Sequence, residues 1–75
     1  MNSRTETNPT QRTPLAIYRY SKNWSQLQLA EKAGVTRETV NRLEQGGSPR
    51  LSTAKALSKA LGYEIESLFP PEESS

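Results

Sequence analysis

The side chains best suited to recognising another molecule lie in residues 34–47, GVTRETVNRLEQGG. At about 100° per residue of an α-helix, Val40 and Leu43 fall on one side, which we expect to face a core. The opposite side carries long or planar hydrogen-bonding groups: Arg37, Glu38, Asn41, Arg42 and Gln45. In the major groove Arg pairs with guanine, Asn or Gln with adenine, and Glu accepts from cytosine. The segment is therefore a candidate for contacting base pairs of double-stranded DNA.

A plainer explanation of this face stays open, because Arg, Glu and Asn are common on any solvated helix. Glu38 is the least clear member. It would repel DNA phosphates, it could select cytosine, or it could simply stabilise the first turn of its helix, where acidic groups are favourable. The residue types alone do not decide between these roles.

The composition excludes most catalytic chemistry. The chain has no cysteine and no histidine, and its eight acidic residues are all glutamate. Disulfides, thiolate metal sites and imidazole bases are therefore missing. We predict a protein that is not an enzyme and that uses no cofactor and no metal.

Charge is unevenly distributed along the 75 residues. The net charge is +2, but residues 1–59 carry ten basic and four acidic groups, whereas residues 60–75 carry four acidic groups and no basic one. This asymmetry indicates a polyanionic partner for the basic part, although a solvated surface with an acidic tail would also explain it.

No apolar run approaches the roughly 20 residues of a membrane span, and residues 1–13 lack the apolar core of a secretory signal. We therefore expect a soluble, intracellular protein.

The chain divides into three parts by composition. Residues 1–12 are polar and are expected to be a flexible arm. Residues 13–69 hold the apolar periodicity of one folded domain, and residues 70–75, PPEESS, are expected to be a disordered acidic tail. Helical patterns are predicted at residues 14–22, 25–33, 36–45, 52–61 and 64–69, and no alternating stretch predicts a strand. The expected fold class is all-α.

Capping signals define the second and third helices. Ser25 followed by Gln28 forms a capping box, Gly34 is a left-handed stop, and Thr36 is an N-cap. Only Val35 separates Gly34 from Thr36, so the two helices must meet at a sharp angle, as in a helix-turn-helix. For the fourth helix we expect Ser52 as N-cap and Gly62 as the stop.

These residues carry a resemblance to a known family. LAIYRYSKNWSQLQLAEKAGVTRETVNRLEQG, residues 15–46, resembles the helix-turn-helix of the phage repressor and Cro class, and the similarity continues through Pro49 and Leu51 to Phe69. The resemblance implies a compact five-helix, lambda-repressor-like bundle with the helix-turn-helix in helices two and three. It also implies a sequence-specific, double-stranded DNA-binding transcriptional regulator, which we expect to be a repressor acting as a homodimer on a palindromic operator. The same resemblance implies a cytoplasmic protein, prokaryotic or phage-encoded, that is associated with the nucleoid.

The resemblance further implies roles for single residues. The side chains expected to contact bases are Arg37, Glu38, Asn41 and Arg42. Those expected to contact phosphates or to position the protein on the backbone are Ser25, Gln26, Thr36, Thr39, Ser48 and Arg50. Gln26 is also expected to brace the third helix. Arg19 and Glu44 are expected to form an internal ion pair between the first and third helices, so neither is expected to contact DNA.

Several features leave alternatives open. Leu27 occupies a usually polar position and is either an exposed apolar residue or an unassigned contact. The dimer surface is undefined, with Ile17, the fifth helix and Phe69 as candidates. An antitoxin-like or other protein-interaction module would use the same fold and a different surface.

Overall fold

The computed structural model describes residues 13–71. Within them the fold is entirely helical, as predicted, and the five helices follow in the expected order. They are α1 (Pro14–Ser21), α2 (Gln26–Ala33), α3 (Arg37–Glu44), α4 (Leu51–Leu61) and α5 (Ile65–Leu68). The predicted arm, residues 1–12, and residues 72–75 of the predicted tail lie outside the described residues.

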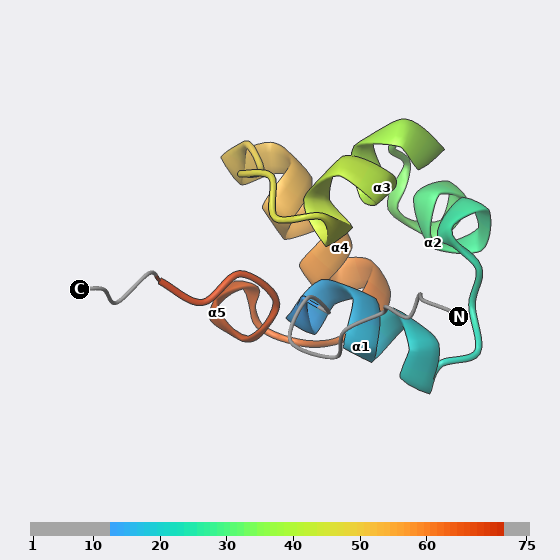
Figure 1. Ribbon diagram of the computed structural model, residues 1–75, viewed down its shortest axis with the longest axis horizontal. Helices are drawn as coiled ribbons and strands as arrows, with labels where there is room; N and C mark the ends of the chain where they lie inside the picture. Colours follow the sequence, from blue (N-terminus) through green and yellow to red (C-terminus); the bar gives the residue numbers. More distant parts are fainter. Residues whose placement is uncertain (1–12, 72–75) are drawn as a thin grey trace, which may run out of the picture.

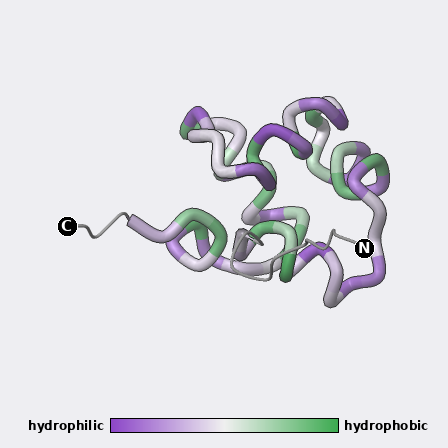
Figure 2. The backbone as a smooth tube through the Cα atoms, viewed as in Figure 1, coloured by the Kyte–Doolittle hydropathy of each residue, from purple (hydrophilic) through white to green (hydrophobic). Residues whose placement is uncertain are grey.

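The five helices form one bundle (Figure 1), and their buried side chains make one small core. Helix α2 contacts both α3 and α4, whereas α1 contacts α3 and α5, and α4 contacts α5. The buried cluster consists of Leu15, Leu29, Ala30, Val40, Leu43, Leu57, Leu61 and Leu68. Every helix supplies at least one of these side chains, so α3 is held by apolar contacts from its neighbours although most of its residues are hydrophilic (Figure 2).

The connection between α2 and α3 follows from local capping chemistry. The Ser25 hydroxyl accepts from the Gln28 amide at 3.0 Å, and the Gln28 side chain accepts from the Ser25 amide at 2.8 Å, which completes the predicted capping box. Gly34 ends α2 with φ 76°, a conformation that glycine adopts without the steric cost of a Cβ. The Thr36 hydroxyl then accepts from the Thr39 amide at 3.1 Å. These local contacts set the angle between the two helices.

The start of α4 differs from the prediction. Ser52 is not the N-cap, because the helix begins at Leu51 and Arg50 occupies the cap position without a side-chain hydrogen bond. A cap is worth only about 1 kcal/mol, which burial of apolar side chains can exceed. Ala54, Leu57 and Leu61 of α4 are all buried, and this packing sets the helix instead. Gly62 ends α4 in the left-handed conformation, as predicted.

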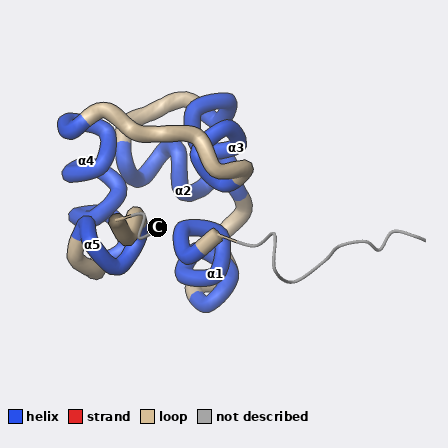
Figure 3. The backbone as a smooth tube through the Cα atoms, turned by 60° about the vertical axis from the view of Figure 1, so that its left-hand side comes forward, coloured by secondary structure: helices blue, strands red, loops and turns tan. Residues whose placement is uncertain are grey.

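Between α3 and α4 the chain runs as an extended loop along one side of the bundle (Figure 3). This loop carries Ser48 and Arg50, and both are exposed. Among residues 13–71, no helix is long and apolar enough to cross a membrane.

Candidate nucleic-acid interface

Helix α3 is divided into a buried and an exposed side. Val40 and Leu43 are 0% and 1% exposed, respectively. The four side chains predicted to contact bases are all exposed on the remaining surface: Arg37, Glu38, Asn41 and Arg42. We call this exposed side of α3, made up of these four residues, the polar strip.

A buried ion pair ties α3 to α1. The Arg19 Nε donates to Glu44 Oε2 at 2.5 Å, and its Nη2 donates to Glu44 Oε1 at 2.9 Å. Arg19 is 6% exposed and Glu44 is 9% exposed. The third donor, Nη1, is hydrogen-bonded to the Trp24 carbonyl at 2.8 Å. The structure thus brings together the two residues that were expected to pair internally, and neither is on the exposed strip.

The electrostatics of this pair favour its charged form. The hydrogen bonds to Glu44 raise the pKa of Arg19 above its ordinary value, and they outweigh the opposite effect of burial. The Glu44 carboxylate therefore stabilises the charged form of the guanidinium. Its charge is balanced by a carboxylate on the helix that it supports.

Gln26 links the start of α2 to the end of α3. Its Nε2 donates to Glu44 Oε1 at 3.0 Å and to Asn41 Oδ1 at 3.3 Å. Gln26 is half-buried, whereas Asn41 is exposed. The contacts give Gln26 the bracing geometry that was expected of it from the sequence. They also connect the buried ion pair to the polar strip.

Asn41 receives a second hydrogen bond on the same atom. The Gln45 Nε2 donates to Asn41 Oδ1 at 3.2 Å. Gln45 was expected on the outward face, with no role of its own. Its contact with Asn41 follows from their spacing of four residues, since side chains at this spacing are neighbours on a helix.

Gly47 lies against Arg42, a contact that the sequence did not predict. A Cβ on Gly47 would be 3.0 Å from the Arg42 carbonyl oxygen and 3.2 Å from its Nη1. The Gly47 amide also donates to the Arg42 carbonyl at 3.0 Å. The absence of a side chain at Gly47 therefore leaves room for the arginine.

The residues expected to contact phosphates lie in two places. Ser25, Thr36 and Thr39 surround the N-termini of α2 and α3, and the Thr36 and Thr39 hydroxyls share a hydrogen bond of 2.8 Å. Ser48 and Arg50 lie in the loop before α4, where both are exposed and Arg50 caps no helix with its side chain. Free N–H groups at helix N-termini are favourable positions for phosphate oxygens.

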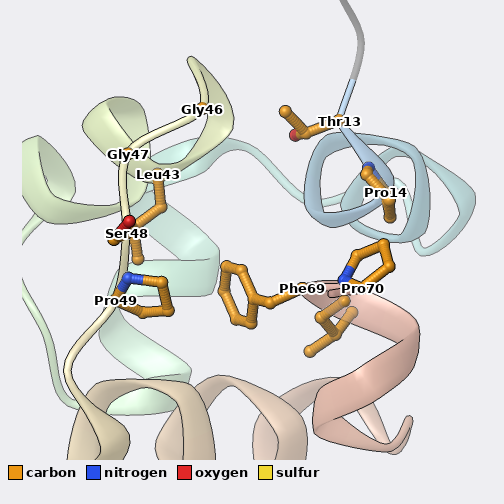
Figure 4. A pocket seen from close by; sticks show the side chains of 10 residues that line it. Thr13, Pro14, Leu43, Gly46, Gly47, Ser48, Pro49, Phe69 and Pro70 are labelled. Carbon is orange, nitrogen blue, oxygen red and sulfur yellow. The ribbon is translucent and has the colours of Figure 1, made fainter. Parts of the chain in front are cut away.

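A pocket of about 400 Å³ lies beside this loop, between Pro49, Phe69 and Pro14 (Figure 4). Ser48 lines it, but no charged side chain does. Among residues 13–71, no group of three or more His, Cys, Asp or Glu is placed to hold a metal ion. The residues predicted to contact bases do not line this pocket and lie on the exposed side of α3.

Two of the apolar residues without an assigned role lie on the surface. Leu27 is 51% exposed and Ile17 is 49% exposed. Phe69 instead packs against the core cluster, which makes it a weaker candidate for a dimer surface.

A family model described as helix-turn-helix matches residues 15–68. The chain belongs to this helix-turn-helix family. The match spans α1 to α5, including the turn at Gly34 and the exposed strip of α3. It confirms the suspected family and the predicted helix-turn-helix in α2 and α3.

Relatives of this helix-turn-helix protein agree with the assignment. An uncharacterised HTH-type transcriptional regulator of Methanothermobacter thermautotrophicus is 42% identical over 64 residues, covering 83% of this chain and 93% of the relative. A second such regulator, of Methanocaldococcus jannaschii, is 38% identical over 60 residues, covering 79% and 91%. The crystal structure of a hypothetical transcription factor from Neisseria superposes with a TM-score of 0.68 at 30% identity, covering 77% of this chain and 68% of the other. These findings support the prediction of a DNA-binding transcriptional regulator.

Proposed function

We propose that this regulator represses transcription by inserting α3 into the major groove of a specific operator. The observation that carries the proposal is the division of α3 into a side buried at Val40 and Leu43 and a side that exposes base-complementary groups. A B-DNA major groove about 12 Å wide accepts one α-helix. Repression needs only occupancy of the operator, so no further surface has to be invoked.

The proposed division of labour follows the geometry. Arg37 and Arg42 are suited to guanine and Glu38 to the cytosine amino group. The groups around the two helix N-termini and the loop contact the flanking backbone: Ser25, Gln26, Thr36, Thr39, Ser48 and Arg50. Backbone contacts set the register of α3 without distinguishing sequences.

We further propose that the protein binds as a homodimer to a palindromic operator in the cytoplasm of a prokaryotic cell. Two-fold symmetric proteins of this kind bind half-sites separated by about one helical turn, or about 34 Å. A net charge of only +2 favours a few local phosphate contacts over a broad basic surface. The logarithm of the affinity should then fall with the logarithm of salt concentration by about 0.9 per neutralised phosphate.

Selection of binders from a random duplex library tests the proposal. We expect enrichment of one sequence with internal two-fold symmetry, and a gel or anisotropy titration that gives two protein chains per duplex. An enriched sequence without symmetry would contradict the dimer. Failure to bind any duplex at low salt would overturn the proposed function and would favour the protein-interaction module.

A further inference from the structure

In the hydrogen-bond network around Asn41, the buried Glu44 carboxylate determines which atoms donate and which accept. The Glu44 carboxylate receives two donors from Arg19, so it is charged and can only accept. The Gln26 atom 3.0 Å from Glu44 Oε1 must therefore be the amide nitrogen Nε2. An amide orientation that is ambiguous in isolation is determined here by its partner.

The orientation of the Gln26 amide in turn determines the orientation of the Asn41 amide. Because Gln26 presents Nε2, the Asn41 atom 3.3 Å away must be the acceptor Oδ1. Gln45 donates to this oxygen as well, at 3.2 Å. A carbonyl oxygen has two lone pairs, and both are used. The Asn41 Nδ2 carries two N–H groups that find no acceptor among residues 13–71, and the side chain is exposed.

We propose that Asn41 contacts base edges that accept hydrogen bonds and does not form the usual pair with adenine. The usual pair requires Nδ2 to donate to adenine N7 while Oδ1 accepts from the adenine amino group. With Oδ1 occupied by Gln26 and Gln45, the adenine amino group lacks an acceptor. Guanine presents acceptors at both N7 and O6, and Asn41 Nδ2 can donate to them.

This inference deepens the proposed function and rests on it. It makes Gln26 and Gln45 positioning residues for a base contact, in addition to the bracing role of Gln26. It also links sequence preference to the buried Arg19–Glu44 pair, because that pair determines the direction of every donor up to Asn41.

The test uses the full chain and the selected operator. The base pair opposite Asn41 is the one at which Asn41→Ala loses sequence preference. At that position we expect guanine to bind at least as well as adenine. Replacing the purine by its 7-deaza analogue should weaken binding by about three- to tenfold, the range of one net hydrogen bond. Removing the adenine 6-amino group should change affinity by less than about twofold, because no acceptor is available to it.

Releasing Oδ1 should reverse the preference. In Gln26→Ala/Gln45→Ala we expect adenine to exceed guanine by about tenfold, as for a bidentate pair. The ratio of the two affinities is the readout, because Gln26 is also proposed to contact phosphate. The preference for adenine should disappear when Asn41→Ala is added to the double variant, because the amide that would pair with adenine is then absent. Gln45→Ala alone should shift the ratio in the same direction but less, and Gln28→Ala, a glutamine outside the network, should leave it unchanged.

The outcomes separate the inference from the function. Three results would overturn the inference alone, provided that the duplex is bound. Wild type could prefer adenine to guanine at the base pair opposite Asn41, or the ratio of the two affinities could be unchanged in Gln26→Ala/Gln45→Ala. The third result is that Asn41→Ala changes the preference at no base position. Absence of duplex binding would overturn the proposed function and the inference with it.

Discussion

The buried Arg19–Glu44 pair ties α3 to α1 and so supports the helix that carries the candidate site. Both are almost completely buried. Arg19 also donates to the Trp24 carbonyl before α2, and Glu44 also accepts from Gln26 at the start of α2. A buried pair adds little net stability by itself, but removal of one partner leaves an uncompensated charge. The residues that contact DNA in our proposal therefore depend on two residues that do not.

Arg19→Ala should lower the free energy of unfolding by about 3–5 kcal/mol, because Glu44 is left charged and buried. Urea denaturation monitored by circular dichroism measures the change, and Lys55→Ala, which removes an exposed cation from α4, should stay within about 0.5 kcal/mol of wild type. Replacement of both partners, in Arg19→Met/Glu44→Leu, should recover much of the loss. Equal stability of Arg19→Ala and Lys55→Ala would show that the pair is solvated.

Arg37 and Arg50 should differ in the kind of DNA contact that they lose. Arg37→Ala is expected to relax preference at one base pair, at a cost of about 1–3 kcal/mol for the best sequence. Arg50→Ala is expected to weaken all sequences alike and to reduce the salt slope by about one unit. Competition titrations with single-base operator variants at several salt concentrations separate the two. The assignment fails when both variants affect every sequence equally.

At the scale of elements, the sequence predicted those helix ends that depend on local chemistry. Ser25, Gln28, Gly34 and Thr36 act within a few residues of their own positions, and all four form the expected contacts or conformation. The start of α4 was mispredicted at Ser52, because its position depends on how Leu57 and Leu61 pack.

The sequence was sufficient to predict which side of α3 is exposed, but not the side-chain contacts that connect this side to the rest of the molecule. Helical periodicity alone separated Val40 and Leu43 from the exposed side of α3. The contact of Gln26 with Asn41 joins residues 15 positions apart, and the approach of Gly47 to Arg42 depends on how the loop folds back. Such contacts between residues far apart in the chain, or between a helix and a loop, depend on tertiary packing and leave no periodic pattern in the sequence.

The loop after α3 offers a test of this packing. Gly47→Ala should displace Arg42, because the new Cβ would lie 3.1 Å from the Arg42 Cγ, and it should reduce discrimination at the Arg42 base pair by up to about tenfold. Operator-variant titrations measure this, and Arg42→Ala should remove any further effect of the glycine change.

Gly46→Ala is the matched control. Gly46 has φ 102°, and apart from the glycine and its two chain neighbours nothing lies within 4 Å of the place that an alanine Cβ would take there. The change should therefore cost stability, about 1–2 kcal/mol, without altering the preference at that base pair. The same loss of preference in both glycine variants would argue against a specific contact between Gly47 and Arg42.

At the scale of the whole molecule, one small core serves to present one helix. The buried cluster draws on all five helices, and α3 contributes to it with only one side. The exposed large hydrophobic residues of the described chain all lie outside α3: Ile17, Tyr20, Leu27, Leu51 and Tyr63. Recognition in our account is thus the property of α3, while affinity comes from the helix N-termini and the loop that flank it.

Methylation interference on the selected operator tests the central claim, that α3 contacts bases in the major groove, most directly. Methylation at guanine N7 lies in the major groove and methylation at adenine N3 lies in the minor groove. We predict that N7 methylation at the guanines of each half-site prevents binding by wild type, and that one of these guanines becomes insensitive in Arg37→Ala. Binding that is blocked by adenine N3 methylation and unaffected by guanine N7 methylation would contradict the account.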